Sequence, residues 1–321
     1  MKIIYLGTPA FAVPSLDALV TAGFEVAAVL CRPDRPAGRG MKDQSPPVKL
    51  AALRHGLTVL QPEKLRGPEL KTQLRALEAD VMVVVAYGLL VPRWVLDLTP
   101  AGCVNVHGSL LPLLRGASPI QSAILQGLPT SGISLMKLDE GMDTGPVYLR
   151  RAVTIAPHET AGELHDRLAA LSAELLPEAL RQIVQGALAA EPQVDAMATH
   201  APKLTPEMEL LDWSLPAVTL DRNIRALSPR PGAHSFFRGK RIKLLRSAIA
   251  MGPLGQAPGS LAAGEPGHPP RVACGEGWLA LLEVQPEGKR VMSGAEFYLG
   301  HRPGPGERFQ PPAPAEGDAA C

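Results

Sequence analysis

The first half of the chain alternates short, continuous hydrophobic runs with segments of helical periodicity. Hydrophobic runs that predict strands cover residues 3–6, 26–31, 58–60, 81–86, 103–107 and 131–138. Helical patterns cover residues 14–22, 48–55, 68–77 and 119–126, and a long amphipathic helix runs from 160 to about 186. Strands that are hydrophobic at every position are typical of a parallel sheet covered by helices on both faces. The pattern therefore predicts an α/β domain.

The pattern changes after a polar, proline-containing stretch at residues 191–207, which we expect to be a linker. Beyond it, one helical piece at 216–226 precedes short strand-like runs at 234–237, 241–246, 271–273 and 278–284. Many short strands between Gly/Pro-rich turns predict a small β-barrel. We therefore expect a catalytic domain at 1–190, a linker at 191–207, a barrel domain at 208–302 and a disordered Pro-rich tail at 303–321.

Composition narrows the class of protein. The chain has 321 residues, a formal net charge of +1 and 46% hydrophobic residues, which is typical of a globular protein with two domains. Its four cysteines lack CxxC spacing, which argues against a disulfide framework or a zinc site. The most hydrophobic run, 81–86, is too short to span a bilayer. We expect a cytoplasmic monomer without a membrane segment or a metal.

Two motifs place polar side chains at the ends of hydrophobic strands. They are Asn105-Val-His107-Gly-Ser-Leu-Leu-Pro112 and Asp139-Glu-Gly-Met-Asp143-Thr-Gly. Asn105 and His107 are two residues apart, so on a strand they point the same way. An amide beside an imidazole is suited to stabilise an oxyanion that develops on a carbonyl, and a carboxylate such as Asp143 orients the imidazole or moves a proton. The motifs indicate acyl-type chemistry.

Other reactions fit the sequence less well. The first strand is followed by Gly7-Thr-Pro and lacks the second and third glycines of a dinucleotide-binding loop, which disfavours a nicotinamide cofactor. Ser109 lacks the Gly-x-Ser-x-Gly context of a serine nucleophile. The histidines other than His107 have no comparable neighbours, and we interpret them as structural or surface residues.

Two clusters of cations suggest a polyanionic partner. A loop after the second strand carries Arg32, Arg35, Arg39 and Lys42 with many Pro and Gly residues. Residues 222–246 contain eight Lys or Arg and no Asp or Glu, at positions 222, 225, 230, 238, 240, 241, 243 and 246. Either cluster is an ordinary solvated surface or a surface for a nucleic acid.

These motifs resemble the folate-dependent formyltransferases that use 10-formyltetrahydrofolate. Within that family the chain is most similar to members that act on methionyl-tRNA, through Gly7-Thr-Pro-x-Phe-Ala, Pro33-Asp-Arg-Pro-Ala-Gly-Arg-Gly40 and Ala79-Asp-Val-Met-Val-Val-Val-Ala-Tyr-Gly88. The resemblance implies a Rossmann-like N-terminal domain, a C-terminal barrel of the oligonucleotide-binding (OB) type, and formyl transfer to the α-amine of methionyl initiator tRNA.

The resemblance also implies roles for individual residues. It makes Asn105, His107 and Asp143 catalytic. It places folate contacts at Ser109, Leu110, Leu111 and Pro112. It places tRNA contacts at Arg32, Arg35, Arg39 and Lys42, with Arg39 as the main one.

Three other interpretations use the same motifs. A formyltransferase for a small amine would share Asn105, His107 and Asp143 without needing residues 190–300 or the arginine loop. A folate-dependent hydrolase would release formate to water. An RNA-binding protein with a decayed active site is a third, against which the intact Asn, His and Asp argue.

Overall fold

The structure is a computed structural model that describes residues 1–37, 42–262, 268–304 and 306–310. The chain divides into two compact units. The first unit comprises Met1–Pro119, Thr130–Thr154 and His165–Ala201. The second comprises Ile120–Pro129, Ile155–Leu164 and the chain from Pro202 onward. Two short segments from the first half of the sequence thus pack with the C-terminal half.

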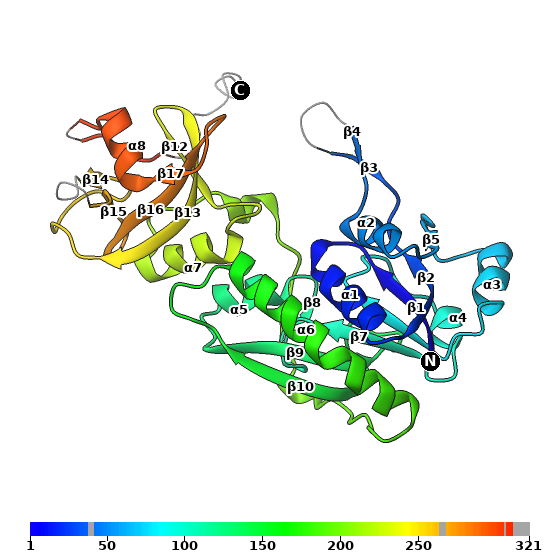
Figure 1. Cartoon of the computed structure of the whole chain (residues 1–321). Helices are drawn as coiled ribbons and strands as arrows, with labels where there is room; N and C mark the ends of the chain where they lie inside the picture. The colour runs from blue at the N-terminus through cyan, green and yellow to red at the C-terminus, as the bar shows by residue number, and fades with distance from the viewer. Residues whose placement is uncertain (38–41, 263–267, 305, 311–321) are drawn as a thin grey trace, which may run out of the picture. The chain divides into compact units, whose positions relative to one another are not determined.

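A seven-stranded sheet forms the centre of the first unit, in the order β10-β9-β7-β6-β1-β2-β5 (Figure 1). Its parallel part consists of β1 (Lys2–Gly7), β2 (Glu25–Leu30), β5 (Val59–Leu60), β6 (Val81–Val85) and β7 (Cys103–His107). Every residue of β6 and β7 is buried, which explains why continuous hydrophobic runs marked these strands. The predicted Rossmann-like arrangement is confirmed.

Helices cover both faces of this sheet. On one face, α3 (Pro68–Arg75) and α4 (Arg93–Leu96) contribute Leu74, Val95 and Leu96 to a core cluster with alternate residues of β1 and β6. On the other, α1 (Val13–Thr21) contacts α6 (Ala161–Val184) through a buried hydrogen bond between the Ser15 and Ser172 hydroxyls. Another helix, α2 (Pro47–Arg54), lies beside α1. No helix in the described ranges is long and hydrophobic enough to cross a membrane.

The sheet is mixed at one edge. The strand β9 (Thr130–Lys137) runs antiparallel to β7, and β10 (Val147–Thr154) runs antiparallel to β9. The hydrophobic pattern does not mark β10, because most of its residues are partly or fully exposed at the edge. The short strands β3 (Arg35–Ala37) and β4 (Lys42–Gln44) pair antiparallel as a hairpin. Arg39 lies outside the described residues.

The second unit contains an antiparallel sheet. Its strands are β12 (His234–Phe237), β13 (Lys240–Ala250), β14 (Leu261–Ala262), β15 (Arg271–Ala273), β16 (Trp278–Pro286) and β17 (Met292–Ser293). The helix α7 (Ala217–Leu227) packs on β13, and α8 (Gly294–His301) packs on β16 (Figure 1). Their side chains enclose one core that includes Leu220, Ile224 and Phe297. The predicted C-terminal β domain is confirmed.

A C-terminal segment connects the two edges of this sheet. Gln310 forms a bridge to Phe236 in β12, and Arg308 forms a bridge to Ser260 beside β14. Phe309 is only 2% exposed and stacks on Trp213 at 5.4 Å. We expected disorder from residue 303, and for residues 306–310 this was wrong, because Phe309 fills the core. Residues 311–321 lie outside the described residues.

Candidate active site

Asn105 and His107 lie side by side on β7 and are nearly buried. They are 8% and 6% exposed, and their partners across the strand pair are Met136 and Ser134 of β9. Their side chains share one face because they are two residues apart. In the part of the chain that the structure describes, the Asn105 side chain makes no hydrogen bond to another residue. Its amide is therefore available to a ligand.

A backbone carbonyl fixes the state of the imidazole. The Nε2 atom of His107 lies 3.0 Å from the carbonyl oxygen of Leu114, and a carbonyl only accepts hydrogen bonds. We infer that Nε2 carries a hydrogen whether or not the ring is charged. Its other nitrogen, Nδ1, lies 3.7 Å from Oδ2 of Asp143. Nδ1 is thus the ring nitrogen that faces the carboxylate and remains available to a ligand.

Asp143 reaches His107 because its loop folds back. Since β9 is antiparallel to β7, its last residue, Lys137, pairs with Val104 at the opposite end of β7 from His107. The loop returns with Asp143 in a left-handed conformation, at a φ of 55°. The backbone N–H of Gly116 then donates to Oδ2 of Asp143 at 2.9 Å. The structure brings together the three predicted catalytic residues.

The segment after His107 is held by its own hydrogen bonds. The Ser109 hydroxyl donates to the carbonyl of Leu113 at 2.6 Å, and the Ser134 hydroxyl accepts from the N–H of Leu111. Ser109 and Leu111 are each 1% exposed, whereas Leu110 and Pro112 are half-buried. Of the four predicted folate contacts, Leu110 and Pro112 are therefore accessible to a ligand, whereas Ser109 and Leu111 are buried.

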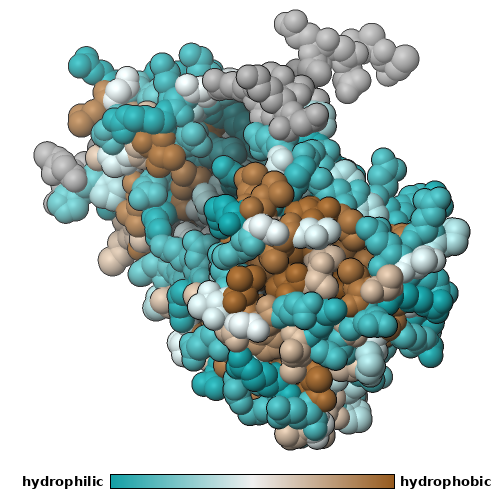
Figure 2. All heavy atoms as spheres, turned by 45° about the vertical axis from the view of Figure 1, so that its right-hand side comes forward, coloured by the Kyte–Doolittle hydropathy of each residue, from teal (hydrophilic) through white to brown (hydrophobic). Residues whose placement is uncertain are grey.

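Two further loops of the first unit carry exposed hydrophobic side chains. Leu90 and Met142 are 87% and 71% exposed. Their loops are joined by an ion pair between Arg93 and Glu140, 3.6 Å apart. Figure 2 shows that hydrophobic side chains form a broad patch on one face of the molecule. Neither Leu90 nor Met142 was predicted from the sequence, since a single exposed Leu or Met side chain belongs to no motif.

The predicted tRNA-contacting residues differ in their surroundings. The Arg32 guanidinium donates to the carbonyl of Gly88 at 2.8 Å, so it is held against the first unit. Arg35 is exposed on β3. Arg39 is outside the described residues, and Lys42 lies on β4 with a side chain that is not described. The hydrogen bond from Lys49 holds the pKa of Asp34 below its usual value, which keeps this carboxylate charged at the base of the hairpin.

The basic run at 222–246 is less free than its sequence suggests. Four of its arginines pair with carboxylates: Arg225 with Asp221, Arg238 with Glu307, Arg241 with Glu209, and Arg246 with Glu163 and Glu283. Lys243 donates to the carbonyl of Pro231. Exposed cations without an ion pair in the described chain are Arg230 and Lys240. The expected eight-cation surface is thus reduced by acids elsewhere in the sequence.

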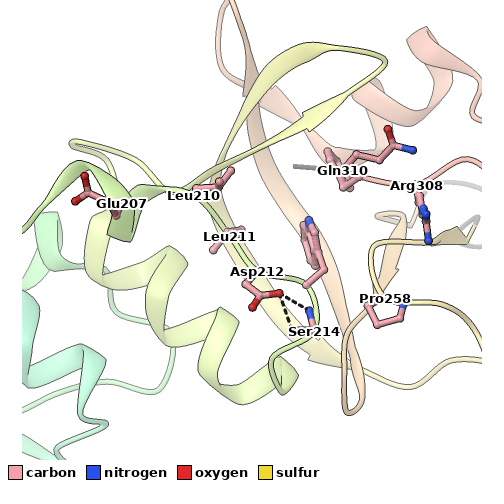
Figure 3. Close-up of a pocket in the computed structure, with 10 residues that line it drawn as sticks. Glu207, Leu210, Leu211, Asp212, Ser214, Pro258, Arg308 and Gln310 are labelled. Carbon is pink, nitrogen blue, oxygen red and sulfur yellow. Dashed lines mark hydrogen bonds between the residues drawn. The ribbon is translucent and has the colours of Figure 1, made fainter. Parts of the chain in front are cut away.

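A separate cavity of about 480 Å³ lies in the second unit, between the chain at 207–214 and the segment at 308–310 (Figure 3). In it the Asp212 carboxylate accepts hydrogen bonds from the Ser214 N–H and hydroxyl, which lower the pKa of Asp212. Among the residues that the structure describes, no predicted catalytic, folate-binding or tRNA-binding residue lines this cavity.

Known proteins are similar to this chain in sequence and in fold. Residues 1–180 match the family model described as formyl transferase, and residues 203–302 match the formyl transferase C-terminal domain. Methionyl-tRNA formyltransferase of Nitrosospira multiformis is 47% identical over 97% of this chain and 99% of its own length. That of Halorhodospira halophila is 49% identical over 96% and 99%. The N-formyltransferase of Helicobacter canadensis, solved with folinic acid and dTDP-3-aminofucose, has a TM-score of 0.66 at 17% identity, over 88% of this chain and 99% of its own.

Proposed function

The chain belongs to the formyl transferase family, and we infer that it is an enzyme that transfers the formyl group of 10-formyltetrahydrofolate to the α-amine of methionyl initiator tRNA. This reaction supports the initiation of translation. The observation that carries the assignment is that relatives named for this reaction match almost the whole chain, including the C-terminal domain.

We propose that Asn105 and His107 stabilise the oxygen of the formyl group during transfer. As the amine attacks, that oxygen gains negative charge, and the Asn105 amide and the Nδ1–H of protonated His107 donate hydrogen bonds to it. Two observations support this. The Asn105 amide has no other partner among the described residues. The Leu114 carbonyl occupies Nε2 of His107, so Nδ1 is the nitrogen that can donate to the formyl oxygen.

Asp143 has two tasks in this proposal. Its carboxylate lies 3.7 Å from Nδ1, close enough to orient the imidazole and far enough to leave the Nδ1–H to another acceptor. Directly or through water, its carboxylate takes a proton from the attacking amine and passes it to the leaving group. 10-Formyltetrahydrofolate supplies the formyl group: the bond from the formyl carbon to N10 breaks as the bond to the amine forms, and tetrahydrofolate leaves with the proton on N10. The formyl group passes directly from N10 to the amine, so the reaction needs no covalent intermediate with the enzyme.

The residues present fit a folate. The half-buried Leu110 and Pro112 and the exposed Leu90 and Met142 provide hydrophobic contacts for its aromatic rings. The family resemblance assigns Ser109 and Leu111 to the same site, and we propose that these two contribute by holding the segment that carries Leu110 and Pro112, through their bonds to Leu113, Ser134 and Arg150. We further propose that Arg32, Arg35, Arg39 and Lys42 serve the tRNA, with Arg32 orienting the hairpin from its bond to Gly88.

A formyl-transfer assay with charged initiator and elongator tRNAs tests the function. Purified enzyme and 10-formyltetrahydrofolate should formylate methionyl initiator tRNA much faster than methionyl elongator tRNA. A His107→Asn variant serves as the inactive control. Formylation of a small amino sugar or nucleotide amine, with none of methionyl-tRNA, would overturn the assignment.

We propose that the enzyme works as a monomer in the cytoplasm, where its aminoacylated tRNA substrate is made. Light scattering of the purified protein at assay concentration should give the mass of one chain, about 34.0 kDa. A dimer mass at that concentration would contradict the monomer.

A further inference from the structure

Gln193 connects a distant part of the chain to the loop that carries Asp143. Its Nε2 atom donates to the carbonyl oxygens of Asp143 and Gly145, at 2.8 Å and 2.7 Å. Its Oε1 atom accepts from Nε and Nη2 of Arg115, at 3.0 Å and 2.9 Å. Both hydrogens of the amide and both acceptor positions are therefore used within the first unit.

Arg115 determines which way the amide of Gln193 points. An arginine only donates hydrogen bonds, so the oxygen of Gln193 must face it and the nitrogen must face the two carbonyls. Arg115 is itself only 5% exposed, and its Nη2 also donates to Asp195 at 2.8 Å. The orientation of the Gln193 amide is thus fixed by the hydrogen bonds that Arg115 donates to its oxygen.

The two carbonyls that Gln193 holds flank the turn that aims the Asp143 carboxylate. Asp143 has a φ of 55°, a left-handed conformation that Asp adopts more readily than most residues other than glycine but that remains uncommon. Such a conformation persists only when neighbouring groups fix it. Gly116 fixes the carboxylate end, and Gln193 fixes the backbone end.

The chain around Gln193 is itself attached to the active-site segments. Glu191 exchanges backbone hydrogen bonds with Val147. Further on, the short strand β11 (His200–Ala201) pairs with β8 (Arg115–Gly116), directly beside the N–H that binds Asp143. These bonds supply a rigid base from which Gln193 acts.

We propose that Gln193 is a positioning residue that holds Asp143 toward His107. This inference rests on the proposed catalytic role of Asp143. Gln193 acts through the loop backbone and touches no reacting atom, so its loss should lower turnover without weakening substrate binding.

The test compares Gln193→Ala and Gln193→Glu with a matched control, Gln182→Ala, whose amide binds Glu178 on the surface of α6. We expect kcat to fall about 10- to 100-fold in Gln193→Ala, the usual range for small misplacement of a catalytic group, with KM within about twofold. Gln193→Glu retains the contact with Arg115 but places a charged acceptor against two carbonyls, so it should lose at least as much. Gln182→Ala should match the wild type.

A double-mutant cycle separates positioning from general stability. In an Asp143→Asn background, Gln193→Ala should lower kcat less than about threefold, because the group it positions is gone. An equal fold-loss in both backgrounds, or an unchanged kcat in Gln193→Ala with active wild type, would overturn the positioning role. Wild type without formyl transfer would instead overturn the proposed function.

Hydrogen exchange gives a readout that needs no activity. Backbone amides of residues 139–145 should exchange faster in Gln193→Ala than in wild type, while those of β1 and β6 stay unchanged. An unaltered exchange rate in residues 139–145 would show that Gln193 does not restrain the loop.

Discussion

Two nearly buried acid–base pairs, one in each unit, differ in how fully their hydrogen bonds are satisfied. In the second unit, Nε of Arg225 lies 2.7 Å from Asp221, whose other oxygen accepts from the Ser247 hydroxyl, and Arg225 also donates to the carbonyl of Glu159. In the first unit, Nδ1 of His107 lies 3.7 Å from Asp143, which is beyond hydrogen-bond distance.

The difference in hydrogen bonding distinguishes a pair that stabilises the fold from a pair that is available for catalysis. Asp221 and Arg225 bind each other, β13 and the segment at 155–164, so little capacity remains for a ligand. The His107 ring and the Asp143 carboxylate each bind one backbone group, from Leu114 and Gly116, and among the described residues their other hydrogen-bonding positions have no partner within hydrogen-bond distance. An incompletely satisfied pair beside an unpartnered amide is what a reaction with changing charge requires.

The largest expected effect comes from breaking the satisfied pair. Arg225→Ala leaves the Asp221 carboxylate buried without its cation, and we expect a loss of about 3–5 kcal/mol in the free energy of unfolding. Denaturant titration measures it. The matched control is Arg93→Ala, because Arg93 also pairs with an aspartate four residues away but in solvent, and it should change stability little. Equal losses in the two variants would contradict the contrast.

Removing the free amide should affect catalysis and spare stability. Asn105→Ala takes away one donor to the developing oxyanion, which usually lowers turnover about 10²–10³-fold. Steady-state kinetics on methionyl initiator tRNA measures kcat, and thermal unfolding checks the fold. Near-wild-type turnover in a folded Asn105→Ala variant would exclude the oxyanion role.

The pairing of cations in the second unit predicts which of them contribute to tRNA affinity. Arg230→Ala and Lys240→Ala should each reduce the slope of log Kd against log salt by about 0.7–0.9, because an unpaired cation that contacts a phosphate releases one counterion. Arg246→Ala should change the slope less, since Arg246 already pairs with Glu163 and Glu283. A larger change for Arg246 than for Lys240 would reverse this ranking.

The smallest effect concerns Glu163, whose pKa is lowered to about 2 by hydrogen bonds from Arg246 and the Thr160 backbone. Because folding lowers this pKa from about 4.5, the pair stabilises the fold above that pH and loses its effect as the pH falls toward 2. Glu163→Gln should therefore be less stable than wild type at neutral pH, with a difference that shrinks in acid. The side chain is 45% exposed, so solvent screening keeps the effect small.

Unfolding curves at several pH values measure this difference. Glu174→Gln, an exposed glutamate in the same helix, is the control and should show no such pH dependence. A Glu163→Gln variant that becomes relatively less stable in acid would contradict the sign.

Elements whose residues are buried on both faces were predictable from sequence. The run at 103–107 coincides with β7, and the spacing of Asn105 and His107 already placed them on one face. The edge strand β10 and the hairpin of β3 and β4 were not predictable, because exposed strands carry mixed polarity. The burial of Phe309 was not predictable either, because a single hydrophobic residue in a Pro- and Gly-rich tail forms no periodic pattern.

The sequence by itself determined which chemical groups are present and which of them share a strand, because side-chain direction along a strand follows from local geometry. The tertiary structure alone decided what each group meets. Because β9 runs antiparallel to β7, the loop after β9 has to fold back to bring Asp143 to His107. Gln193, which is 50 residues further along the chain, holds that loop. The tertiary structure also paired four arginines of the basic run with carboxylates. Contacts across such separations depend on chain packing, and no local pattern records them.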